Sequence, residues 1–251
     1  MLPKILKPKF IDDLIRLGDK SDGGYVISNK MLKNCKFCLT FGLGDNFSFE
    51  SDLKKKNPNS KIFVYDHSVS ILFWLKHFFF WLWHSVRFRN FNFRFLYFIK
   101  YIFFFKIQNN SHYPIKISKK NYPISKVLLE NNIDPKHTIL KIDIDGDEYE
   151  IIDEINKYDF LGLIIEFEQF GKNINKIIDF VVSNKNLSII HIHGNNFLSY
   201  GKNQMPEAIE ISFINTKFVN TDIKNNRNYP ILGLDFPNNP LKEDLKIYFE
   251  N

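Results

Sequence analysis

Two acidic side chains near the middle of the chain, Asp143 and Asp145, have the clearest chemical potential. They follow an apolar run and belong to a stretch, 140–148, that carries four acids within six residues. Strand alternation would place both on one side, at the sheet edge where ligands bind. Because crowded carboxylates repel one another, they need a bound proton or a positive partner. The stretch therefore predicts a site for a cationic ligand or for a divalent metal held by oxygen atoms.

A glycine-rich turn follows the first predicted buried strand. Gly42 and Gly44 let the backbone approach a ligand closely, and Asp45 and Asn46 supply polar groups beside them. The third glycine of a dinucleotide-binding turn is replaced by Phe47, so a tight seat for a pyrophosphate is not predicted. The turn indicates a nucleotide-type ligand without specifying which one.

An acid also ends the next predicted strand. Asp66 lies 24 residues after Gly42, at a place where a carboxylate can accept hydrogen bonds from both hydroxyls of an adenosine ribose, and His67 follows it. Asp66 could instead only end the strand or cap a helix. Together with the glycine turn, it predicts a site for an adenosine-containing cofactor.

Further polar residues stand at later strand ends. Adjacent strand ends converge, so Glu166 or Glu168, and His191 or His193, are expected to meet Asp143 and Asp145 over one pocket. His193 would serve as a general base, since imidazole titrates near neutral pH. Two alternatives stay open, which are a divalent metal bound by Asp145, Glu166 and His193, and a structural histidine with satisfied hydrogen bonds.

The elements that position these residues alternate along the chain. This order predicts an α/β fold, a Rossmann-like, doubly wound, mostly parallel sheet with helices on both faces and late antiparallel strands at the sheet edge. A chain of this length is expected to form one domain, 1–251, with an insertion at 69–115. We expect a helix or strand at 11–17, strands at 36–42, 61–66, 138–144, 161–167, 187–193, 208–214, 217–220 and 231–236, and helices at 49–56, 124–132, 147–156 and 173–185.

The insertion is rich in aromatic and basic residues. The chain has a net charge of +6, and no Asp or Glu occurs between Asp66 and Glu130. Lys76 and several arginines interrupt every apolar window, so a membrane-spanning segment is not predicted. Helices over 71–106 could close the cofactor site as a lid, contact a second copy in a homo-oligomer, or lie on an anionic membrane surface. Nucleic acid is disfavoured, because so much phenylalanine must be buried.

The sequence resembles the FkbM-type family of S-adenosylmethionine-dependent methyltransferases, which has a Rossmann-like class I fold. The most specific match is the Lys-hydrophobic-Asp-hydrophobic-acid-Gly-x-Glu pattern around Asp143. The resemblance implies that Gly42, Gly44 and Asp45 line the methionine part of the cofactor, Asp66 the ribose and Asp143 the amino end. Asp145 departs from the Glu of many relatives. The resemblance rests on segments 22–26, 41–45, 65–67, 140–148, 165–167, 191–196 and 234–239.

The predicted function is therefore S-adenosylmethionine-dependent methylation of a hydroxyl on a sugar or glycan acceptor, which could be lipid-linked. Asp145, Glu166 and His193 are the predicted catalytic residues. The alternatives are an NAD-dependent sugar-modifying enzyme and a noncatalytic, membrane-associated binding protein. Residues 1–10 lack the continuous apolar region of a secretory signal, so a cytoplasmic location is expected, at the inner membrane surface if the insertion binds lipid.

Overall fold

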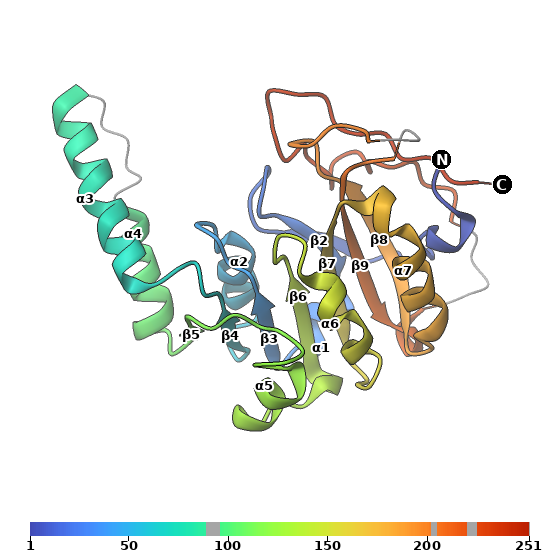
Figure 1. Cartoon of the computed structure of the whole chain (residues 1–251), viewed down its shortest axis with the longest axis horizontal. Helices are drawn as coiled ribbons and strands as arrows, with labels where there is room; N and C mark the ends of the chain where they lie inside the picture. The colour runs from blue at the N-terminus through green and yellow to red at the C-terminus, as the bar shows by residue number, and fades with distance from the viewer. Residues whose placement is uncertain (89–95, 202–204, 220–224, 251) are drawn as a thin grey trace.

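A seven-stranded sheet lies at the centre of the part of the chain that the structure describes (Figure 1). The structure is a computed structural model that describes residues 1–88, 96–201, 205–219 and 225–250. In spatial order the strands are β5 (Ser111–Tyr113), β4 (Lys61–Tyr65), β3 (Phe37–Phe41), β6 (Thr138–Ile142), β7 (Gly162–Glu168), β9 (Ala208–Asn215) and β8 (Leu187–Gly194). The pairs from β5 to β7 are parallel, and β9 is antiparallel to both neighbours. The predicted Rossmann-like, mostly parallel sheet is confirmed.

Helices cover both faces of this sheet, as the two hydrophobic cores demonstrate (Figure 1). Neighbouring residues of β3 point to opposite faces, so Leu39 belongs to one core and Cys38 to the other. One core includes residues of α5 (Ile124–Glu130), α6 (Glu148–Ile155) and α7 (Phe170–Ser183). The other includes residues of α1 (Asn29–Asn34) and α2 (Ser48–Lys56).

The predicted element at 11–17 is a strand. β1 (Leu14–Leu17) pairs antiparallel with β2 (Tyr25–Ser28) in a separate two-stranded sheet. Gly18 and Gly23 have φ angles of 87° and 82° in the connecting segment, where residues without a side chain are favoured. The Ser212 hydroxyl of β9 donates a hydrogen bond to the Val26 carbonyl at 2.6 Å, which ties this small sheet to the large one.

The late strands differ in part from the prediction. β9 is antiparallel, as expected of a late strand, but its partners are β7 and β8, and it lies between them rather than at the edge. All eight residues of β9 are buried, which is compatible with this central place. No strand forms at the predicted position 217–220 within the described residues. Thr216–Phe218 is a 3₁₀ helix there, and Asn220 lies outside the described residues. The predicted strand at 231–236 is only an isolated bridge between Leu232 and Asp235.

The aromatic insertion is helical, as predicted. It comprises α3 (Ile71–Phe88), α4 (Leu96–Ile102) and a π-helical turn, Phe103–Ile107, and the two α-helices extend from the β5 edge of the sheet (Figure 1). Arg89 and Arg94 lie outside the described residues. Trp74 is buried at the base of α3 and stacks on Tyr101 with ring centroids 5.1 Å apart. Within the described ranges, no helix combines the length and apolarity needed to cross a membrane.

Candidate active site

A cavity of about 300 Å³ lies where β3, β4, β6 and β7 end, and we call it the main cavity. The carboxyl ends of parallel strands are the usual ligand-binding edge of an open α/β sheet. Of the predicted site residues, nine line the main cavity and His193 does not. The nine are Gly42, Gly44, Asp45, Asn46, Asp66, His67, Asp143, Asp145 and Glu166.

The glycine turn forms one wall of the main cavity. Gly42 and Gly44 adopt φ angles of 81° and 59°, in the left-handed region that favours glycine. At Gly42 a Cβ atom would lie 1.6 Å from the Asp143 carbonyl oxygen, so any side chain would clash with the end of β6. At Gly44 a Cβ atom would meet no atom within 4 Å. Gly42 is therefore required by close packing of two strand ends, and Gly44 by its backbone conformation alone.

Asp66 holds this turn in place. Its Oδ2 atom accepts hydrogen bonds from the backbone N–H groups of Leu43 and Gly44, at 2.7 and 2.9 Å. Its Oδ1 atom accepts two from Ser68, both at 2.7 Å. Burial acts to raise the pKa of Asp66, but these hydrogen bonds outweigh it and hold the pKa below the usual value. Asp66 is therefore ionised and fixed at the cavity wall, and its contact with a ribose stays a prediction.

Asp143 also lines the main cavity, and two residues from different elements contact its side chain. The Tyr25 hydroxyl donates a hydrogen bond to Asp143 Oδ2 at 2.9 Å, and Lys141 Nζ lies 3.8 Å from the same oxygen. Lys141 is buried and also lies 3.9 Å from Glu50. Burial acts to lower the pKa of Lys141, but Glu50, Asp143 and Glu166 raise it above the usual value. The ammonium group is thus charged, and the carboxylates on both sides share it.

The acidic stretch after β6 turns sharply instead of continuing as a strand. β6 ends at Ile142, and Asp145 has a φ angle of 52°, a left-handed conformation that Asp tolerates better than most residues. Strand alternation therefore does not explain why Asp143 and Asp145 share the main cavity. Asp147 forms an ion pair with Lys116, and Glu148 accepts hydrogen bonds from backbone N–H groups below the cavity.

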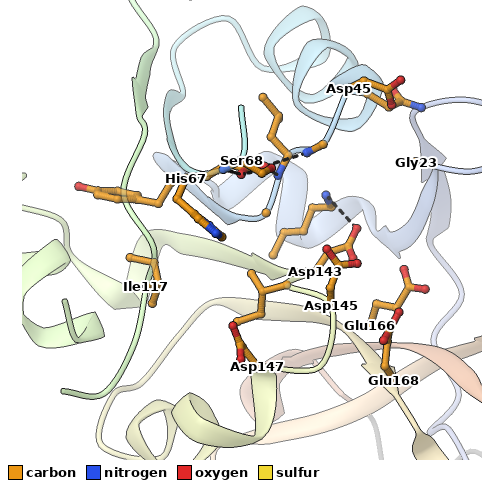
Figure 2. A pocket seen from close by; sticks show the side chains of 18 of the residues that line it. Gly23, Asp45, His67, Ser68, Ile117, Asp143, Asp145, Asp147, Glu166 and Glu168 are labelled. Carbon is orange, nitrogen blue, oxygen red and sulfur yellow. Dashed lines mark hydrogen bonds and ion pairs between the residues drawn. The ribbon is translucent and has the colours of Figure 1, made fainter. Parts of the chain in front are cut away.

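Glu166 and Glu168, at the end of β7, complete the acidic wall (Figure 2). Glu166 is buried and accepts a hydrogen bond from the Asn195 side chain at 2.7 Å. Burial is the main cause that raises the pKa of Glu166, and repulsion from Asp143 adds to it. Burial and nearby carboxylates also raise the pKa of Asp145 and of Glu168. Figure 2 shows Asp143, Asp145, Glu166 and Glu168 grouped together, away from His67 and Ile117.

The main cavity therefore has a strong excess of negative charge. Its lysines, Lys116 and Lys141, both lie within ion-pair distance of cavity carboxylates. A ligand that carries positive charge would relieve the repulsion that raises the carboxyl pKa values, whereas an anionic ligand would increase it. Eight lining residues are acidic, namely Asp22, Asp45, Asp66, Asp143, Asp145, Asp147, Glu166 and Glu168.

The location of His193 contradicts its predicted role as general base. Its side chain is buried outside the main cavity, with Nδ1 3.3 Å from Glu210 and Nε2 3.0 Å from Asp244. Burial acts to lower the pKa of His193, but hydrogen bonds to Asp244 and Glu210 raise it to about 10. A protonated imidazole that donates through both nitrogens has no lone pair with which to accept a proton. His193 is a structural histidine, which was one of the alternatives left open.

The structure also does not assemble the predicted metal site. Among the described residues, no three or more His, Cys, Asp and Glu side chains are arranged to hold a metal ion. Asp145 and Glu166 line the main cavity, but both nitrogens of His193 are occupied by other carboxylates.

Several residues of the site were missed by sequence reasoning. Lys141 precedes Asp143 by two residues on one strand, so alternation could have placed both side chains on one face. Tyr25 lies in a glycine-containing motif that was noted, yet only the pairing of β1 with β2 brings it to Asp143. Glu168, in contrast, was expected as an alternative to Glu166, and both line the main cavity. No local signal pointed to Asn195 as the partner of Glu166.

A second cavity of about 220 Å³ lies beside the first, and we call it the aromatic cavity. It shares Asp45 and Asn46 with the main cavity, so the two meet at the glycine turn. Its other walls come from α3 and α4, through Trp74, His77, Phe78, Trp81, Tyr97 and Phe98. The insertion thus contributes the aromatic side of a space that adjoins the candidate active site.

No protein-family model matches this sequence, and no curated protein matches it. Similar solved structures include a precorrin-6y C5,15-methyltransferase from Geobacter metallireducens GS-15, with 13% identity over 74% of this chain and 85% of that chain and a TM-score of 0.39. A pre-rRNA processing fibrillarin of Methanococcus jannaschii has 13% identity over 73% and 67%, with a TM-score of 0.39. M. jannaschii TYW2, in complex with AdoMet, has 8% identity over 82% and 89%, with a TM-score of 0.38. These similarities assign neither a family nor a substrate to this chain.

Proposed function

We propose that this protein is an S-adenosylmethionine-dependent methyltransferase. The observation that carries the proposal is the main cavity itself, an acid-lined pocket beside a glycine turn at the carboxyl edge of parallel strands. S-adenosylmethionine carries a sulfonium and an amino group, both positive, as well as an adenosine. Its positive groups would relieve the repulsion among the cavity carboxylates.

The same charge argues against the NAD-dependent alternative. NAD carries an anionic pyrophosphate, which would face eight acidic residues. The third-glycine position is Phe47, which is buried against the aromatic insertion and packs its ring on Trp74 and Phe104. A pyrophosphate seat at the start of α2 is therefore not favoured.

Cofactor contacts are proposed by position in the FkbM-type pattern. Gly42, Gly44 and Asp45 would line the methionine part, and Asp143, held by Tyr25, would receive the amino group. The adenosine would lie toward Asp66, which would meet the ribose, with Asn46 and His67 nearby in the same cavity.

The proposed reaction is an in-line displacement at the sulfonium methyl group. When bound, S-adenosylmethionine would supply an electrophilic methyl group, so that the acceptor oxygen would bond to the methyl carbon as the carbon–sulfur bond breaks, with S-adenosylhomocysteine as the leaving group. The acceptor proton passes to Asp145 or Glu166. Burial raises the pKa of both carboxyl groups, and repulsion from Asp143 adds to it, which makes each carboxylate a stronger base than an exposed one. Holding both reactants in near-attack geometry would supply much of the acceleration.

For the acceptor we propose a hydroxyl of a sugar or glycan. The support is the FkbM-type pattern together with the lining near Glu166. Asn195 offers an amide group, and Phe197, which is half exposed, offers an aromatic face. Such a combination can bind the hydroxyls and the apolar face of a sugar ring.

Calorimetric titration with S-adenosylmethionine, S-adenosylhomocysteine and NAD tests the proposal. We expect the first two to bind the wild-type protein, and Asp143→Asn to weaken S-adenosylmethionine by at least about tenfold, because a charge-assisted contact is lost. Asp153→Asn, a change of an exposed acid on α6, is the matched control and should bind as the wild type does. Binding of NAD alone would refute the proposal. Binding of none of the three would favour the noncatalytic alternative.

A further inference from the structure

The outer face of α3 carries large apolar side chains that are more than half exposed. Leu72, Phe79, Trp83 and Val86 are 56%, 62%, 59% and 68% exposed. They are seven, four and three residues apart, which places them on one side of an α-helix. We call these four residues the α3 stripe. A regular, exposed apolar stripe of this kind indicates an interaction surface.

The α3 stripe is not the side on which the two helices pack together. That contact uses other residues, since Phe78 of α3 meets Phe98 of α4 with ring centroids 5.7 Å apart. Trp74 is buried on Tyr101 at the base of the pair. The helix is thus apolar on two sides, and its contacts with α4 among the described residues use the side that carries Trp74 and Phe78.

The neighbouring turns carry a second run of exposed apolar residues. Ile99, Phe103 and Ile107 are spaced four residues apart and are 54%, 49% and 67% exposed. Figure 1 shows α3 and α4 extending away from the central sheet, where a large flat partner could reach them.

The charge of this region is of one sign. Lys76 and Arg87 are exposed on α3, and Lys100 and Lys106 are exposed on the following helical turns. The sequence has no Asp or Glu between Asp66 and Glu130. Apolar and aromatic side chains flanked only by cations match an anionic lipid surface, in which aromatic residues settle at the headgroup level and cations meet lipid phosphates.

We propose that α3 and the helical turns after it lie on an anionic membrane surface, with the α3 stripe among the lipid headgroups and acyl chains. A second copy of the chain fits this face less well. A two-fold contact would bring the same cations of both copies together, and like charges across an interface are unfavourable. The proposal does not depend on the proposed catalytic function.

Vesicle co-sedimentation tests it with the whole protein. Wild-type protein should bind phosphatidylcholine vesicles that contain phosphatidylglycerol at least about tenfold better than pure phosphatidylcholine vesicles, and added salt should weaken binding. The variant Leu72→Ser, Phe79→Ser, Trp83→Ser, Val86→Ser should lose binding by at least about tenfold, because less apolar area enters the lipid.

A matched control carries serine at three exposed leucines elsewhere. Leu129, Leu232 and Leu241 are 82%, 102% and 93% exposed and lie outside the insertion, so their replacement should leave vesicle binding unchanged. Circular dichroism should give the same spectrum for all three proteins, since every altered side chain is exposed. Absence of binding to phosphatidylglycerol vesicles, or equal binding by the stripe variant, would overturn the proposal. Self-association that the stripe changes abolish, without vesicle binding, would assign the face to a second copy.

Discussion

Two groups of carboxylates in this protein are built in opposite ways. The main cavity is lined by eight acidic residues but by only two lysines among the described residues, Lys141 and Lys116, each of which lies within ion-pair distance of one cavity carboxylate. In the second group, which we call the histidine cluster, His191 pairs with Asp235, and His193 pairs with Glu210 and Asp244. The cluster has its positive charge built in, whereas the cavity leaves carboxylates in repulsion. The difference suggests that the cluster stabilises the fold and that the cavity awaits a cationic ligand.

The largest expected effect comes from breaking the cavity wall. Gly42→Ala should destabilise the protein by about 4 kcal/mol or more and abolish S-adenosylmethionine binding, because the new Cβ would overlap the Asp143 carbonyl oxygen. Gly44→Ala is the matched control, since its Cβ meets no atom and only the left-handed conformation opposes it, by about 1–2 kcal/mol. Chemical denaturation measures both. Equal losses in the two variants would mean that strand-end packing is not what requires Gly42.

Next in size is the histidine cluster. His193→Gln should lower the free energy of unfolding by about 3–5 kcal/mol, because Glu210 and Asp244 lose their cation. The folded-state pKa of about 10 exceeds the ordinary 6.5, so the stabilisation is complete below pH 6.5 and is lost as pH rises through 10. The difference in the free energy of unfolding between the wild type and His193→Gln, measured by chemical denaturation, should therefore become smaller from pH 6 to pH 10.

The partly exposed His137 supplies the control for this change, and His137→Gln should lower the free energy of unfolding by less than about 1 kcal/mol. If His193→Gln retained full stability but lost methyl transfer, the structural role of His193 would be refuted and its predicted role as general base would be favoured.

A smaller effect is expected beneath the cavity, at Glu148. Burial raises the pKa of Glu148 from 4.5 to about 7, so the folded state binds its proton more tightly than the unfolded state does. This residue therefore favours folding below pH 4.5, and the contribution is lost as pH rises through 7, by up to about 3 kcal/mol. In Glu148→Gln this part of the pH dependence should vanish in denaturation curves taken at several pH values. Glu150→Gln, at an exposed site on the same helix, should keep it.

The smallest effect concerns the orientation of Asp143. Tyr25→Phe removes one hydrogen bond of 2.9 Å but keeps the ring beneath Lys141, whose ammonium lies 4.9 Å from the ring centroid. S-adenosylmethionine affinity should fall by about 1 kcal/mol, or about fivefold, in calorimetric titration. Tyr248→Phe, at an exposed tyrosine, should change nothing. Unaltered affinity in Tyr25→Phe would show that Asp143 does not need this partner.

Local motifs were enough to predict much of the fold and nine of the residues that line the main cavity. Glycine next to a buried strand predicted the turn at Gly42, and acids at strand ends predicted that Asp66 and Asp143 would lie together. What failed depended on partners far along the chain. His193 meets residues 210 and 244, which no spacing rule connects to it. Asp145 reaches the cavity through a left-handed turn rather than through strand alternation.

The position of β9 was missed for a related reason. The sequence order of strands does not reveal that β9 inserts between β7 and β8, and burial does not reveal it either, because the edge strand β8 is also almost completely buried. Such placements depend on which strand pairing buries the most apolar surface, a property of the whole chain.

Helix α3 has a consequence for optical measurements. The chain has three tryptophans, Trp74, Trp81 and Trp83, and all belong to this helix. Trp74 is buried in the aromatic stack and borders the aromatic cavity, Trp81 lines the same cavity, and Trp83 is exposed on the α3 stripe. The tryptophan emission of the protein thus comes entirely from the insertion. Three single tryptophan-to-phenylalanine variants would divide that emission among the core, the cavity and the outer face without any added label.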